Sequence, residues 1–78
     1  MLEAQPILEV AVAAPVMGVF DYRAPHTTDG PLQLGQRVRV PFGRGTRLGW
    51  LVGSKAASDL PEHRLRRVLS VLDAEPLL

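Results

Sequence analysis

The stretch from residue 37 to residue 53, RVRVPFGRGTRLGWLVG, constrains the fold of this chain most strongly. Its first half alternates between an apolar and a basic side, which predicts a half-buried strand because successive strand side chains point to opposite faces. Alternation resumes after the Gly-rich turn at residues 43–46, so the stretch predicts a β-hairpin. The alternating sets are Val38, Val40 and Phe42 against Arg37, Arg39 and Pro41, then Leu48, Trp50 and Val52 against Gly49, Leu51 and Gly53.

The charge of the chain is unevenly distributed. The hairpin stretch contains four arginines and no acid, whereas residues 1–36 contain one arginine and four acids, although the net charge is only +1. Glycines at 43, 45 and 49 leave bare backbone near the turn, where N–H groups can approach a ligand closely. The plain alternative is that these basic strand faces are solvated surface.

Length and composition set further limits. A chain of 78 residues has room for one domain with a modest core, and the absence of cysteine excludes disulfides and Cys-ligated zinc. Two histidines are too few for a His-built metal site. No apolar run approaches the ~18 residues that span a bilayer, and Glu3 stands where a signal peptide is basic, so we expect no membrane association and a cytoplasmic location. A pI near 8.4 is too low for a nonspecific nucleic-acid coat, so any DNA recognition is expected to be local.

The rest of the chain also favours short strands. We expect strands at residues 7–13 and 19–24, an exposed loop at 25–31 and a polar loop at 54–63. Residues 64–73 are ambiguous, because their leucines and valines fit helical spacing while VLSVL also fits a strand that closes a small sheet. The leucines at the end of the sequence suggest a fragment of a longer protein. The fold class expected from the residues is therefore mainly β.

The sequence offers little for catalysis. It has no cysteine nucleophile, no His–carboxylate pair within one segment, no Walker-type loop and no metal-ligand spacing. PFGRGTRLG lies between two strands and lacks the lysine of a phosphate-binding loop, so its glycines indicate a turn. We expect no enzyme active site and no cofactor within this chain.

Binding of nucleic acid is better supported. Phe20 and Tyr22 share one strand face and could stack on bases, although that face is more often core. Asp21 then points away from the core. A carboxylate repels phosphate but accepts strong hydrogen bonds from a hydroxyl, and a DNA strand offers a free sugar hydroxyl at its 3′ end. The alternative is that Asp21 is an ordinary surface aspartate in a turn, which is the commoner case.

Several segments together resemble the N-terminal domain of the PriA family of primosomal replication-restart DNA helicases. The resemblance covers nearly the whole chain and is carried by VAV, VFDY, LQLGQRVRVPFGR, LGWLVG and LRRVLSVLDAEPLL. It implies a small barrel-like or OB-like antiparallel sheet of five to six short strands, and it favours a strand at 64–73. It also implies that residues 1–78 form one N-terminal domain that binds the 3′ end of the nascent leading strand at arrested forks.

The resemblance also implies site residues. Phe20 and Asp21 would meet the terminal nucleotide, with Asp21 on the 3′-hydroxyl, and Gly43 would be the position of close backbone approach. The basic residue of the last segment, usually lysine in the family, is Arg66 here, with Arg64 and Arg67 as neighbours able to replace it. The expected DNA-binding set, in which Tyr22 mainly packs, is Phe20, Asp21, Tyr22, Gly43, Arg44 and Arg66.

The expected function is thus recognition of a 3′-OH DNA end, by a pocket that contacts the terminal nucleotide whatever the base sequence. By resemblance, the parent protein would be an ATP-dependent 3′→5′ helicase using ATP, Mg²⁺ and zinc outside this chain. Its partners would include its own remaining domains, single-stranded DNA-binding protein and other primosome proteins. The alternative is a β-barrel that docks on another protein through its apolar strand faces and its terminal leucines, Leu77 and Leu78.

Overall fold

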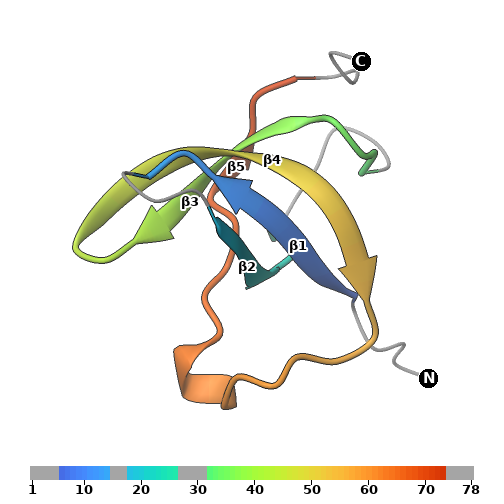
Figure 1. The fold of residues 1–78 in the computed structure, drawn as a ribbon, viewed down its shortest axis with the longest axis vertical. Helices are drawn as coiled ribbons and strands as arrows, with labels where there is room; N and C mark the ends of the chain where they lie inside the picture. Colours follow the sequence, from blue (N-terminus) through green and yellow to red (C-terminus); the bar gives the residue numbers. More distant parts are fainter. Residues whose placement is uncertain (1–5, 15–17, 27–31, 74–78) are drawn as a thin grey trace.

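The computed structural model describes residues 6–14, 18–26 and 32–73 (Figure 1). Strands dominate this part of the chain, which confirms the mainly β prediction. Residues 27–31 of the predicted loop, together with Leu77 and Leu78, lie outside the described residues. The elements are β1 (Ile7–Val12), β2 (Gly18–Arg23), β3 (Arg37–Phe42), β4 (Gly45–Lys55), the 3₁₀ turn η1 (Glu62–Arg64) and β5 (Ser70–Val71).

The described strands form one antiparallel sheet in the order β2-β1-β4-β3-β5. The segment leading into β5 joins the two edges of this sheet. On one side the segment bonds to Arg23, the last residue of β2. Arg23 N–H donates to the Arg66 carbonyl at 2.8 Å, and Val68 N–H donates to the Arg23 carbonyl at 2.9 Å. On the other side Leu69 N–H donates to the Arg39 carbonyl of β3 at 2.8 Å. The sheet is thereby closed into the barrel-like form that was predicted.

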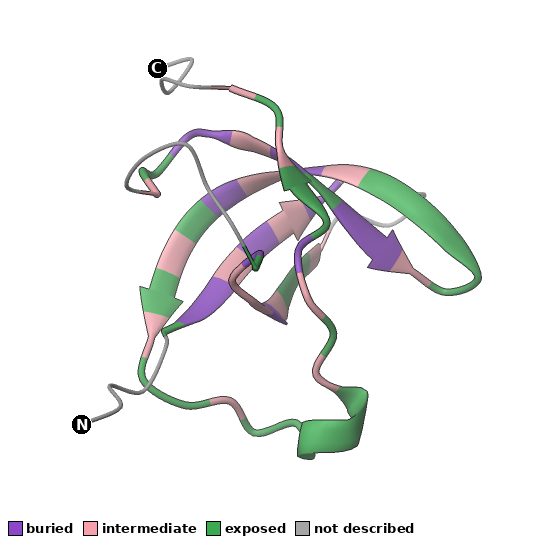
Figure 2. Cartoon of the chain, turned by 180° about the vertical axis from the view of Figure 1, so that it is seen from behind, coloured by how far each residue is buried: buried purple, intermediate pink, exposed green. Residues whose placement is uncertain are grey.

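The core consists mainly of valines (Figure 2). β-Branched side chains pack well on a pleated surface, and alternation sends every second one inward. Leu8, Tyr22 and Leu51 complete the cluster. The fully buried valines are Val10, Val12, Val38, Val40 and Val68.

The hairpin was predicted correctly, but its second strand buries the side with fewer large residues. Leu51 faces the core at 3% exposure, whereas Val52 lies at a register shift against β1 and is 48% exposed. Gly49 is a packing glycine, because an added Cβ would lie 2.5 Å from Val10 Cγ1 and 3.0 Å from the Ala11 carbonyl oxygen. Of the three glycines expected to offer backbone to a ligand, Gly49 is therefore unsuitable.

The ambiguous segment 64–73 is extended, apart from the end of η1, and the helical alternative is wrong. Its backbone bonds go to β2 and β3, and only a two-residue strand, β5, forms. Val68 is the buried residue of the segment, while Leu69 and Leu72 are 52% and 42% exposed. Edge pairing of the sheet therefore outweighs the helical spacing of its apolar residues.

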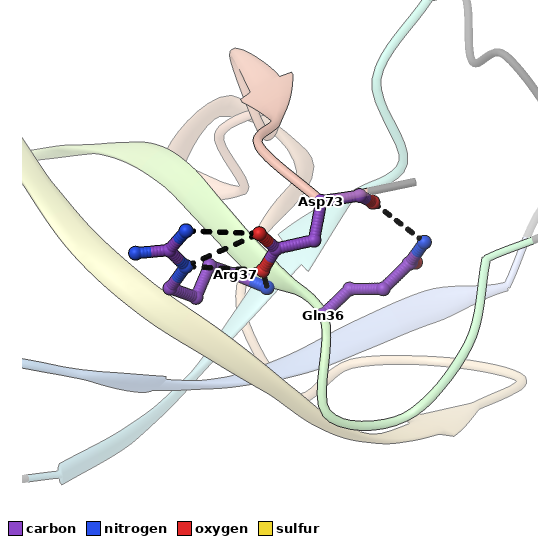
Figure 3. Close-up of polar contacts among 3 residues, drawn as sticks. All are labelled: Gln36, Arg37 and Asp73. Carbon is purple, nitrogen blue, oxygen red and sulfur yellow. Dashed lines mark hydrogen bonds and ion pairs between the residues drawn. The ribbon is translucent and has the colours of Figure 1, made fainter. Parts of the chain in front are cut away.

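Gln36, Arg37 and Asp73 fasten the end of this segment to the start of β3 (Figure 3). The Asp73 carboxylate accepts the backbone N–H of Arg37 at 2.9 Å and its guanidinium Nη2 at 2.9 Å. The buried Gln36 side chain donates to the Asp73 carbonyl at 3.0 Å. Hydrogen bonds from Arg37 lower the pKa of Asp73, so the contact stays charged well into the acidic range.

Candidate nucleic-acid interface

Four of the predicted site residues meet at one end of the barrel. Tyr22 is buried on β2, and its hydroxyl donates to the Pro41 carbonyl at 2.8 Å, which ties β2 to the end of β3. The β3–β4 turn follows directly after β3, and there Arg66 Nη1 donates to the Gly43 carbonyl at 2.9 Å. Burial raises the pKa of Tyr22, and the nearby positive charge of Arg66 opposes this rise.

Phe20 completes this group. It shares the core-facing side of β2 with Tyr22, yet it remains 38% exposed, so packing was confirmed for Tyr22 and only in part for Phe20. Its ring meets the ring of Phe42 edge to face, with centroids 5.2 Å apart. Gly18 makes room for it, since a Cβ there would lie 2.9 Å from a ring carbon of Phe20. The barrel thus ends in two aromatic rings, one of them open to solvent.

The turn beside these rings has an unobstructed backbone. Gly43 has φ = +57°, in the left-handed region that favours glycine, and an added Cβ would meet nothing within 4 Å. Arg44 follows as an exposed turn residue. A ligand can therefore approach the main chain at Gly43 with an arginine on each side, Arg44 along the chain and Arg66 across from it.

The Asp21 carboxylate lies on the opposite face of β2 from Phe20 and Tyr22, as alternation predicts. Ser58 donates to its Oδ2, and Lys55 Nζ lies 3.0 Å from the same oxygen. Burial raises the pKa of Asp21, but the hydrogen bonds from Ser58 and Lys55 outweigh it, and the pKa falls below its ordinary value. The carboxylate is therefore charged and fixed, and within the described residues its hydrogen bond and its ion pair go to Ser58 and Lys55 and not to Arg66 or Gly43.

One oxygen of that carboxylate remains available. Both contacts use Oδ2, and among the described residues Oδ1 accepts no hydrogen bond. With respect to the described residues, Oδ1 therefore retains the capacity to accept a hydrogen bond. Asp21 therefore presents a negatively charged acceptor whose position is set by its other oxygen.

The main chain of Asp21 faces the Arg66 side of β2. In an antiparallel strand the N–H and C=O groups of alternate residues point to the same edge. Arg23 uses that edge to bond the last segment, so the groups of Asp21 point the same way. Within the described residues, the backbone bonds across this edge involve Arg23 and not Asp21. In the described part of the chain, the edge of β2 is consequently unpaired at Asp21, beside the exposed ring of Phe20.

The three arginines left open by the sequence have separate positions. Arg66 reaches the turn, whereas Arg67 Nη1 donates to the Ala24 carbonyl at 2.7 Å and supports the chain beyond β2. Arg64 is exposed in η1. Arg66 is therefore the one in place to act with Gly43.

Sequence reasoning missed Phe42, which meets Phe20 at the barrel end, and Lys55 and Ser58, which hold the Asp21 carboxylate on the other face of β2. Phe42 alternates with the core valines and carried no sign that it would meet Phe20 at the barrel end. Ser58 was read as part of a polar loop, and its bond to Asp21 spans 37 positions of sequence. Among residues 6–14, 18–26 and 32–73, no group of three or more His, Cys, Asp or Glu is arranged to hold a metal.

Comparison with known proteins identifies the family. Residues 9–78 match the family model of the PriA 3′DNA-binding domain (3′BD). Replication restart protein PriA of Haemophilus influenzae is 42% identical over 71 residues, covering 91% of this chain and 10% of that protein. The Bacillus subtilis protein of the same name is 39% identical over 59 residues, covering 76% of this chain and 7% of its own length. A probable replication restart protein PriA of Deinococcus radiodurans is 42% identical over 67 residues, or 85% of this chain and 7% of the relative.

The chain thus spans a tenth or less of the length of these relatives. The part that it matches is a DNA-binding domain and not a catalytic one. Its exposed ring, bare turn and arginine lie together at one end of the barrel. The chain belongs to the family of PriA 3′DNA-binding domains.

Proposed function

We propose that the chain holds the 3′-terminal nucleotide of a DNA strand between β2, the Gly43 turn and Arg66. The observation that carries this proposal is the bond from Arg66 to the Gly43 carbonyl, because it brings the last segment against the turn. The open edge of β2 and the exposed ring of Phe20 border the same place. The family name supports DNA as the ligand and the 3′ side as the part bound.

Each part of a terminal nucleotide finds a matching group in this pocket. The ring of Phe20 offers an apolar surface to the base. Arg66 uses one N–H on Gly43 and retains further donors for a phosphate, and Arg44 adds a second positive charge from the turn. Tyr22 lies in the core next to this pocket and fixes β2 to β3 through its hydrogen bond to the Pro41 carbonyl.

Asp21 supplies the selectivity for an end. Its side chain lies on the face of β2 opposite Phe20, so in this role Oδ1 accepts a hydrogen bond from a free 3′-hydroxyl that extends past the edge of the strand, while Lys55 and Ser58 keep the carboxylate ionised. Within a strand the 3′ oxygen carries a phosphate, which this negative charge repels. The pocket therefore distinguishes an end from an interior without reading base sequence.

The test is a comparison of two oligonucleotides that differ only at the 3′ end. We expect a 3′-hydroxyl oligonucleotide to bind more tightly than the same strand ended in a 3′-phosphate, measured by fluorescence anisotropy. A 5′-phosphorylated strand controls for added charge and should bind like the unmodified one. Equal affinities for the two 3′ ends would remove Asp21 from this role.

The biological setting that we propose follows from the family. Residues 1–78 would be the N-terminal domain of a longer replication-restart protein that recognises the single-stranded 3′ end of the nascent leading strand at arrested forks. Its ATP-dependent helicase motor, with ATP, Mg²⁺ and zinc, would lie outside this chain. We propose a cytoplasmic location, and single-stranded DNA-binding protein and other primosome proteins as partners. No helix in the described ranges has the length and apolarity needed to cross a membrane.

A further inference from the structure

The β3–β4 hairpin carries arginines that are not neutralised by acidic side chains. Within the described ranges, ion pairs engage Arg23, Arg37 and Lys55, but not the three arginines nearer the hairpin tip. The hairpin projects beyond the neighbouring strands in both views of the fold (Figures 1 and 2). It is therefore a positively charged arm, with its charge at Arg39, Arg44 and Arg47.

The register of the hairpin places two of these arginines on opposite faces. Directly opposed residues of an antiparallel pair share a face. Arg47 lies opposite Val40, which is fully buried, so Arg47 extends from the core-facing side of the arm. Arg39 lies opposite Leu48 on the outer side. Both arginines are exposed, and they differ chiefly in the face they occupy.

The face of Arg47 is continuous with the proposed pocket. Phe42 follows Val40 on this side of β3, and its ring contacts Phe20. Phe42 and Arg47 are diagonal neighbours across the hairpin, about 7–8 Å apart, a spacing that aromatic and long side chains bridge. Arg66 comes from the segment that flanks β3 on the side away from β4. Phe42 therefore lies on the strand between Arg66 and Arg47, with the ring of Phe20 against its own ring.

We propose that Phe42 and Arg47 form a second subsite, which receives the nucleotide 5′ to the terminal one. This inference rests on the proposed function, because it requires the terminal nucleotide to sit beside Arg66 and Gly43. The strand that leaves this pocket across the two rings places its second base near Phe42. Its next phosphate then meets the unneutralised guanidinium of Arg47. The ligand class is the sugar–phosphate backbone of a single-stranded 3′ tail.

The experiment uses the strand length and a matched pair of variants. Competition anisotropy would compare 3′-hydroxyl oligothymidylates of two and eight nucleotides on wild type, Arg47→Gln and Arg39→Gln. The dinucleotide has a single phosphodiester and lacks the phosphate on the 5′ side of its second nucleotide, which is the phosphate that meets Arg47. We expect Arg47→Gln to lower the affinity for the octamer about three- to fivefold, as loss of an exposed ion pair does. The affinity for the dinucleotide should not change. Arg39→Gln removes the same charge from the outer face and should leave both affinities near wild type.

The outcomes separate this inference from the function on which it rests. If Arg47→Gln binds the octamer like wild type while the 3′-hydroxyl preference persists, the subsite is wrong and the pocket stands. Equal losses in Arg47→Gln and Arg39→Gln would show a diffuse charge effect and also overturn the subsite. If the 3′-hydroxyl and 3′-phosphate dinucleotides bind wild type equally, the end pocket itself is wrong.

Discussion

Asp21 combines a largely covered carboxylate with one oxygen that accepts no hydrogen bond from the described residues. Its side chain is only 16% exposed, yet Lys55 and Ser58 stabilise the charged form through Oδ2. An ionised group in such a place is costly unless it is hydrogen-bonded. The arrangement keeps the carboxylate charged.

Replacing Asp21 with asparagine should weaken binding of a 3′-hydroxyl end about tenfold, because a hydrogen bond to a charged group contributes roughly 1.5 kcal/mol or more. The same variant should bind a 3′-phosphate end better than wild type does, since the repulsion is lost. Anisotropy with both oligonucleotides measures the change. Ser58→Ala is the control that keeps the charge and removes one positioning bond. If Asp21→Asn lowers both affinities equally, the residue does not distinguish the ends.

Gly43 and Gly45 offer a second comparison between single residues. Gly43→Ala forces a side chain into the left-handed region and should cost about 1–2 kcal/mol of unfolding free energy. Gly45 has no positive φ, and a Cβ there meets nothing within 4 Å, so Gly45→Ala should be nearly neutral. Urea unfolding of both variants tests this. Equal stability of the two would mean that the turn does not depend on the conformation of Gly43.

The segment 64–73 brings together the parts of the proposed nucleotide site. It closes the barrel by bonding β2 and β3, and it carries Arg66 to the turn. Its end is held by Arg37 and Gln36 through Asp73. Stabilisation of this short, extended element thus depends on contacts to distant strands.

The contact between Asp73 and Arg37 predicts an acid-dependent stability. The pKa of Asp73 is lowered in the folded state, so its contribution is present above the ordinary aspartate pKa of 3.8 and is lost as pH falls through the lower folded value. Asp21, whose pKa is also lowered, acts in the same direction. Asp73→Asn should therefore flatten the fall in unfolding free energy below pH 4, measured by urea unfolding at several pH values. An unchanged pH profile in Asp73→Asn would contradict this assignment.

Elements with local signals were predictable from the sequence. The bounds of β1, β2 and β3 agree with prediction within one residue, because alternation and flanking turn formers act over short distances. The segment 64–73 had no such signal, since its conformation depends on edges supplied by β2 and β3. The same holds for Asp21, whose face was predictable although its partners in β4 and the following loop were not.

At the scale of the whole molecule, charge distribution matters more than net charge. A net charge of +1 conceals a hairpin arm without acids and a barrel in which Asp21, Glu62 and Asp73 form ion pairs. We expect such a molecule to bind DNA at one end instead of coating it. The valine core and the closed sheet hold that end in place.

This distribution predicts a shallow salt dependence of DNA binding. Each phosphate neutralised on a single strand contributes a slope of about −0.7 in log K against log salt, so contacts to two or three phosphates give roughly −1.5 to −2. Titrations of an octamer from low to moderate salt measure the slope. Affinity that does not change with salt would favour the alternative of apolar protein docking over DNA binding.

The most direct test of end recognition is a chemical-shift map of the domain with a 3′-hydroxyl dinucleotide. The account predicts the largest amide shifts at Phe20, Asp21, Gly43 and Arg44, with a shift of the Arg66 side chain, and much smaller shifts with the 3′-phosphate dinucleotide. Shifts concentrated elsewhere on the barrel, or the same map with both dinucleotides, would contradict it.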